Sequence, residues 1–321
     1  MQRVASLHLW HFVVRSAGLP SSPVALLLAC ALCASCGPAG KPPPQAVEDT
    51  QTSGRISVVV TPELLPVLRN EVQAFVALYP QASITLKAGT TREAVAALLS
   101  RQSDLAVVGR ELEPEERTVK VKGGMELEGY RFAKDAVCIV VHPANPTEHM
   151  SAEELRQIYL GQVTQWDRLG GAKGAIEPVL QPLDGDITVS FLQTALGGEM
   201  PTAPAHRVAD DSAVVAEVRA TPGAIGFVSS RWAARGAKAV PVSALRGLPA
   251  QAVDIEAVYK GEYPLTRDFE LYVRSTGPRL ANGLITFVTS LDGQKLVHEA
   301  GWVPTAVPVR FARRSPMLSS H

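Results

Sequence analysis

The chain has 321 residues, of which 46% are hydrophobic and 19% charged, a composition typical of a folded protein with a substantial core. Its 31 basic residues equal its 31 acidic residues in number, which argues against a nucleic-acid-binding protein. The length favours two domains or one large domain. The one cluster of arginines falls in the C-terminal segment 310–321, which we interpret as a solvated tail.

The N-terminal segment has the composition of a secretion signal. Basic residues precede an apolar run, 24–35, which is shorter than a membrane-spanning helix and typical of the hydrophobic region of a signal peptide. Small residues then lead to Cys36, and this pattern resembles a bacterial lipoprotein signal, in which the cysteine is acylated; Cys30 is the competing cysteine. We predict a signal peptide over 1–36 that ends in lipidation at Cys36, with a plainly secreted protein and an N-terminal membrane anchor as the alternatives.

After the signal, residues 37–53 are rich in proline and are predicted to form a tether. Strands and helices then alternate with short connections, which predicts an α/β fold with parallel strands. Thr61 is the expected N-cap of the first helix, Thr90 or Thr91 that of the second, and Ser151 begins a capping box. The expected strands are 55–60, 83–89, 104–109, 136–143, 176–183, 224–229 and 269–274, and the expected helices are 61–80, 90–102, 151–161, 188–198, 211–223 and 281–301.

Sequence motifs for catalysis and metal binding are absent. No histidines stand at metal-ligand spacing, so we predict no metal site. The nucleophile elbow, the Ser-x-x-Lys motif and the glycine-rich nucleotide loops are also missing, so we predict a protein that is not an enzyme and needs no cofactor. A secreted hydrolase stays as an alternative for which no nucleophile and base can be named. Cys138 lies in an apolar strand and is expected to be a buried, inert thiol, and the acidic pairs Glu115–Glu116 and Asp210–Asp211 are interpreted as solvated faces.

Small polar residues recur where a predicted strand passes into a helix. Thr61, then Gly89 with Thr90 and Thr91, and Asp186 with Thr188 all stand at such places. Free N–H groups and the helix dipole make these positions able to bind anions, although ordinary helix capping explains the same residues.

Arg110 follows the strand 104–109 directly. It is either a ligand-binding cation at the carboxyl end of a strand or a solvated surface charge.

Several segments together resemble one family. They are the Gly-x-Val-Thr-x-Trp-x-x-Leu-Gly-Gly run at 161–171, the Pro-Gly-Ala-Ile-Gly-Phe run at 222–227, the segment 263–267, and the strand that ends in Gly-Arg at 109–110. The chain is similar over about 54–305 to the phosphate-binding proteins of ABC importers, which have the class II periplasmic-binding-protein fold.

The resemblance implies a two-lobed α/β architecture, each lobe being a mainly parallel sheet flanked by helices. Lobe I would comprise 54–140 and 263–309, and lobe II would comprise 141–262. It further implies an extracytoplasmic, lipid-anchored monomer that captures phosphate or a related oxyanion and delivers it to an ABC permease, with no nucleic-acid partner.

The resemblance also implies a ligand site, formed by Thr61, Gly89, Thr90, Thr91, Arg110, Asp186 and Thr188. The sequence departs from the family pattern in its charges. Glu63 and Asp186 stand where the family has hydroxyls, and Val189 and Pro182 stand where it has arginines. The alternative is therefore the same fold with altered or lost ligand binding, acting as a sensor or as an envelope interaction protein.

Overall fold

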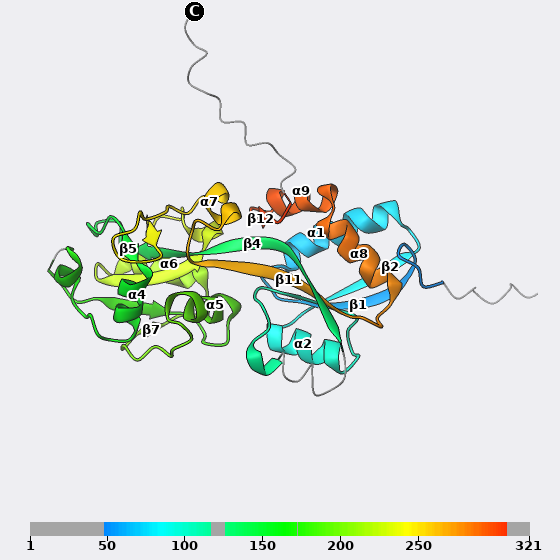
Figure 1. The fold of residues 1–321 in the computed structure, drawn as a ribbon, viewed down its shortest axis with the longest axis horizontal. Helices are drawn as coiled ribbons and strands as arrows, with labels where there is room; N and C mark the ends of the chain where they lie inside the picture. The colour runs from blue at the N-terminus through cyan, green and yellow to red at the C-terminus, as the bar shows by residue number, and fades with distance from the viewer. Residues whose placement is uncertain (1–47, 117–125, 172, 307–321) are drawn as a thin grey trace, which may run out of the picture. The chain divides into compact units, whose positions relative to one another are not determined.

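The computed structural model describes residues 48–116, 126–171 and 173–306, which form a β-sheet flanked by helices (Figure 1). The strands are β1 (Gly54–Val60), β2 (Ala82–Ala88), β3 (Leu105–Val108), β4 (Leu127–Val141), β5 (Met150–Ser151), β6 (Glu177–Leu180), β7 (His206–Arg207), β8 (Ala224–Ser229), β9 (Lys238–Val240), β10 (Val242–Ser243), β11 (Thr266–Arg274) and β12 (Val303–Pro304). The α-helices are α1 (Leu65–Leu78), α2 (Thr91–Leu99), α4 (Ala152–Tyr159), α5 (Asp186–Ala195), α6 (Asp211–Ala220), α7 (Ile255–Lys260), α8 (Arg279–Thr289) and α9 (Leu291–Glu299).

The main sheet has the strand order β2-β1-β3-β11-β4-β8-β6-β7. Strands β1, β2 and β3 are parallel to one another, and so are β6, β7 and β8. The long strand β4 connects the two groups, because its first part pairs with β11 and its last part, 137–141, pairs with β8. The α/β prediction is thus confirmed, but the sheet is mixed, since β4 and β11 run antiparallel to their neighbours.

Apolar side chains cover both faces of this sheet. In β1, Ile56 and Val58 pack in a cluster with α1 and α8, whereas Val59 packs in a separate cluster with α2. In β4, Ile139 faces the cluster that contains α4 and α5, and Val140 faces α6. Burial on both faces explains why the strands are continuous apolar runs rather than alternating ones.

The start of α1 differs from the sequence prediction. The helix begins at Leu65, with Leu64 as its N-cap and a proline within its first turn, so Thr61 is not the cap. The Thr61 carbonyl instead accepts from the N–H groups of Leu64 and Leu65, at 3.0 and 3.1 Å, in a turn that precedes the helix. Pro66 suits the first turn because its missing N–H has no helical partner there.

The other predicted caps are confirmed. Thr90 caps α2 and Ser151 caps α4, each in a capping box with the glutamate three residues later. Cys138 is fully buried, and burial raises the pKa of its thiol to about 12, so the thiol is inert as predicted.

The cysteines of the predicted lipid anchor, Cys30 and Cys36, lie outside the described residues, and so does the tail 310–321. Residues 48–53 pack against the fold, because the Asp49 carboxylate accepts from the N–H groups of Arg279 and Leu280 at the start of α8. Within the part of the chain that the structure describes, no helix combines the length and apolarity needed to cross a membrane.

Candidate functional site

Polar residues from four elements meet at one edge of the sheet. The parallel pairing of β1 with β3, in which Val60 lies opposite Val107, brings the loops after both strands to the same edge. These loops carry Glu63 and the pair Gly109–Arg110, while Thr91 is the first residue of α2 and Asp186 the first residue of α5. The carboxyl ends of parallel strands are where open α/β sheets bind ligands.

The Asp186 carboxylate lies at the centre of this cluster. Its Oδ2 accepts from the Thr91 hydroxyl at 2.7 Å and from the Gly109 N–H at 3.0 Å. Its Oδ1 lies 3.4 Å from Nε of Arg110. The Asp186 side chain is only 8% exposed, so two hydrogen-bond donors and a guanidinium nitrogen enclose a carboxylate of the protein itself. We call Thr91, Gly109 and Arg110 the anion cradle.

Arg110 is neither a free ligand-binding cation nor a solvated charge. Its side chain is 6% exposed, and its two terminal nitrogens lie 2.8 and 3.0 Å from the two oxygens of Glu116. A carboxylate oxygen of Glu113 lies 3.4 Å away. Burial opposes the charged form of Glu116, but the hydrogen bonds from Arg110 and from the Glu113 N–H, together with the charges of Arg110 and Arg92, lower the pKa of the Glu116 carboxyl below its ordinary value. The interpretation of Glu116 as part of a solvated face is therefore wrong, and the run of acids after Arg110 was the signal for this pairing.

Glu63, whose side chain is 29% exposed, forms a second charge network beside the cradle. Its two oxygens accept from Arg267 at 3.0 and 2.8 Å, and Arg267 also donates to Asp135 at 3.0 and 2.7 Å. Arg267 is 1% exposed and Asp135 is completely buried. Burial raises the pKa of Glu63 to about 6, although the charge and hydrogen bonds of Arg267 oppose that rise.

Glu63 and Asp186 both face Gly109. A Cβ atom at position 109 would overlap Oε1 of Glu63 and would lie 2.7 Å from Oδ2 of Asp186. A side chain at position 109 would therefore have to displace one or both carboxylates. The two acidic departures from the family pattern, Glu63 and Asp186, therefore point into the site.

The remaining predicted site residues have separate surroundings. The Thr90 hydroxyl is used in the capping box with Glu93, and Gly89 donates its N–H to the Val60 carbonyl at 3.0 Å. Thr61 and Thr188 are buried, and their hydroxyls have no hydrogen-bond partner among the described residues.

A cavity of about 360 Å³ adjoins the cluster. Five carboxylates line this cavity, together with Trp232, and no lysine, arginine or histidine of the described chain does so. Burial raises the pKa of one of these acids, Asp211, although a 2.8 Å hydrogen bond from Gln181 opposes that rise. Asp211 is partly buried and accepts from Gln181 and from the Ser229 N–H, so it is not the fully solvated residue that we predicted. The residues lining the cavity are Thr61, Pro62, Glu63, Thr90, Thr91, Gln181, Asp184, Gly185, Asp186, Ile187, Asp210, Asp211, Ser212 and Trp232.

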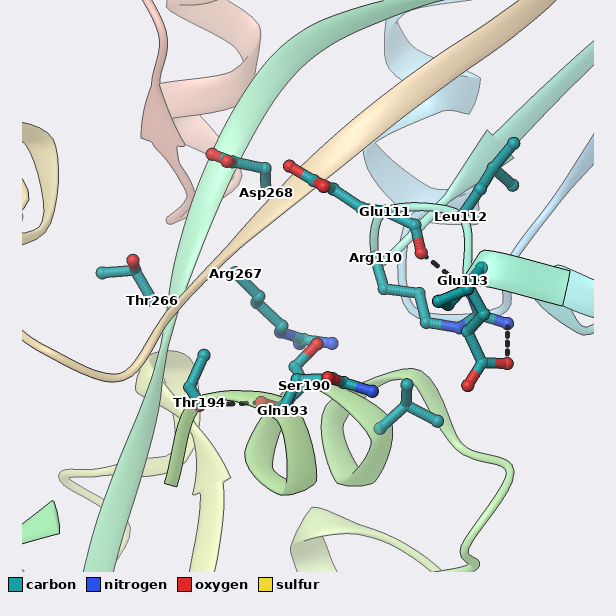
Figure 2. Close-up of a pocket in the computed structure, with 12 residues that line it drawn as sticks. Arg110, Glu111, Leu112, Glu113, Ser190, Gln193, Thr194, Thr266, Arg267 and Asp268 are labelled. Carbon is teal, nitrogen blue, oxygen red and sulfur yellow. Dashed lines mark hydrogen bonds and ion pairs between the residues drawn. The ribbon is translucent and has the colours of Figure 1, made fainter. Parts of the chain in front are cut away.

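A second cavity of about 350 Å³ adjoins the same two arginines. Figure 2 shows Arg110, from the loop after β3, and Arg267, from β11, with Ser190, Gln193 and Thr194 of α5 opposite them. The Ser190 hydroxyl donates to the carbonyl of Asp186 at 2.8 Å. Sequence reasoning assigned no role to these α5 residues, since they read as an ordinary helix.

Comparison with known proteins agrees with this architecture. The family model of the PBP superfamily domain matches residues 45–292. Phosphate-binding protein PstS of Bacillus subtilis is 24% identical over 85% of this chain and 89% of its own length. PstS of Pseudomonas aeruginosa is also 24% identical, with the same coverage.

Solved structures give the same result for the fold. An ABC-type phosphate transport receptor from Vibrio cholerae has a TM-score of 0.67 at 22% identity, covering 78% of this chain and all of that one. PstS from Borrelia burgdorferi has a TM-score of 0.63 at 17% identity, covering 79% and 100% of the two chains. The predicted two-lobed periplasmic-binding-protein fold is therefore confirmed.

Proposed function

Because this chain belongs to the PBP superfamily, we propose that it is an extracytoplasmic solute-binding protein that captures phosphate or a related oxyanion for an ABC importer. One observation carries the proposal. The Thr91 hydroxyl, the Gly109 N–H and the Arg110 guanidinium converge on a single carboxylate, that of Asp186, so the cradle has the geometry of an anion site.

The chemistry of the cradle suits an oxyanion. A hydroxyl, a backbone N–H and a guanidinium each donate to oxygen, and the N-terminus of α2 adds its positive dipole at Thr91. The buried Thr61 hydroxyl, which lines the adjoining cavity, supplies one more donor. All of these groups act as hydrogen-bond donors or as a cation, so the role we propose for them is binding.

We extend the proposal to the lobes and to the anchor. With lobe I as 54–140 and 263–309 and lobe II as 141–262, the cradle belongs to the first lobe and Asp186 to the second. A ligand that contacts both lobes stabilises the closed form, which an importer recognises. Lipidation at Cys36, or at Cys30, would keep this monomer near its permease. Detergent partition of the Cys36→Ser and Cys30→Ser variants tests which cysteine carries the lipid.

Isothermal titration calorimetry with inorganic phosphate tests the binding proposal. We expect a micromolar dissociation constant for the wild type and about tenfold weaker binding for Thr61→Val, which removes a buried donor that no described residue uses and keeps the side-chain shape. Thr286→Val is the matched control, because this exposed α8 hydroxyl bonds only its own helix, at the Asn282 carbonyl. No binding at millimolar phosphate to a folded wild type would refute the proposal.

The charges of the cavity favour a second candidate function. Five carboxylates line it without a basic side chain from the described chain, and Arg110 is paired with Glu116. Such a site repels a doubly charged anion. The second candidate is therefore the same fold with altered or lost ligand binding, acting as a sensor or an envelope interaction protein, and the same titration distinguishes the two.

A further inference from the structure

We propose that the Asp186 carboxylate competes with the free anion for the cradle. Asp186 occupies the cradle in the ligand-free protein and must be displaced before the anion can bind. This inference rests on the proposed function for the identity of the ligand. It assigns Asp186 as the residue that sets the affinity of the site.

The contacts of Asp186 are those that a bound oxyanion would make. One oxygen accepts from both the Thr91 hydroxyl, at 2.7 Å, and the Gly109 N–H, at 3.0 Å, and the other lies 3.4 Å from Arg110. A carboxylate and a phosphate oxygen have the same preference for such donors. Both cannot use one N–H and one hydroxyl at the same time, so the ligand gains these bonds only when Asp186 loses them.

Capping of α5 does not explain the position of the side chain. Asp186 is the first residue of α5, and the described structure records no side-chain hydrogen bond at the Gly185 cap. The bonds of the Asp186 carboxylate run to residues 95 and 77 positions earlier in the chain, at the start of α2 and in the loop after β3. The carboxylate thus bridges two separate parts of the fold instead of stabilising its own helix.

Among the residues that the structure describes, the charges around Arg110 leave no surplus cation for a second anion. Arg110 faces Glu116 at 2.8 Å, Glu113 at 3.4 Å and Asp186 at 3.4 Å. Glu63 approaches the same glycine from the other side and is bound to Arg267. Removal of the Asp186 charge is therefore the single change that frees both the donors and part of the guanidinium.

The test compares Asp186→Ser with Asp184→Ser in phosphate titrations. Asp184 lines the same cavity, is exposed and takes part in no recorded hydrogen bond, so its substitution removes the same charge without freeing the cradle. We expect phosphate to bind Asp186→Ser about tenfold tighter than the wild type, and Asp184→Ser to change affinity much less. Equal or weaker binding by Asp186→Ser, with the wild type binding, overturns the inference and leaves the proposed function standing.

Hydrogen exchange of the Gly109 amide provides the second measurement. Without phosphate, the amide should exchange faster in Asp186→Ser than in the wild type, because it has lost its acceptor. Unchanged protection of the Gly109 amide overturns the inference whether or not the two proteins bind phosphate. A lack of phosphate binding would refute the proposed function separately. Faster exchange confirms that Asp186 holds the Gly109 amide, and the phosphate titration then decides whether the two anions compete.

Discussion

Glu71 provides a quantitative test of the structure, because it is an acid in the core of the chain. It lies on α1, is completely buried, and neither of its carboxylate oxygens has a hydrogen-bond partner among the described residues. Burial without a partner disfavours the charged form and raises the pKa of Glu71 from 4.5 to about 9. At neutral pH the residue is therefore protonated in the folded protein and ionised in the unfolded chain.

This difference makes stability depend on pH in a defined direction. The folded pKa is raised, so the contribution of Glu71 is fully present below pH 4.5 and is lost as the pH rises towards about 9. Each pH unit in that window removes about 1.4 kcal/mol. From pH 4.5 to pH 7 the loss is about 3 kcal/mol.

Urea denaturation of the wild type and Glu71→Gln, followed by circular dichroism at several pH values, measures the effect. Glutamine keeps the shape and cannot ionise, so the difference in unfolding free energy should shift by about 3 kcal/mol in favour of the variant between pH 4.5 and pH 7. Glu153→Gln, at an exposed position of α4, is the control and should show no such shift. Parallel pH profiles for the wild type and Glu71→Gln would refute the reasoning.

Three further predictions concern the site and its supports. Gly109→Ala should lower the free energy of unfolding by about 1–3 kcal/mol and abolish phosphate binding, because its Cβ collides with two carboxylates; an unchanged melting temperature would contradict this. Arg267→Met should destabilise the protein by about 3–5 kcal/mol in chemical denaturation, since it leaves the buried Asp135 carboxylate unpaired, and a loss under 1 kcal/mol would show that the network with Glu63 is not as described. Thr90→Ala should lose about 1 kcal/mol of stability through its cap while phosphate affinity stays within a factor of two of the wild type, and a larger loss of affinity would place its hydroxyl in the site instead.

Local sequence patterns predicted the parts of the fold that depend on neighbouring residues. The capping boxes at Thr90 and Ser151 follow from a hydroxyl and a glutamate three positions apart, and both are present. The predicted start of α1 at Thr61 was wrong. Both Pro62 and Pro66 suit a first helical turn, and only Pro66 lies in the helix. The antiparallel course of β4 and β11 depends on how distant segments cross, which hydrophobic periodicity does not encode.

The sequence predicted the donor groups of the candidate site but did not predict which residues these groups contact. Strand ends placed Thr91 and Arg110 at one edge, and the structure brings them to Asp186. The partner of Glu63 is Arg267, 204 positions away, so no spacing rule connects them. Charge pairs of this kind form through the tertiary fold, and the sequence shows only that acidic and basic residues are present in equal number.

A crystal structure of the protein grown with phosphate tests the central claim most directly. We expect one phosphate oxygen within hydrogen-bond distance of the Thr91 hydroxyl and the Gly109 N–H, with the Asp186 carboxylate displaced from both. Phosphate bound at another place, or Asp186 retaining both contacts at saturating phosphate, would contradict the account.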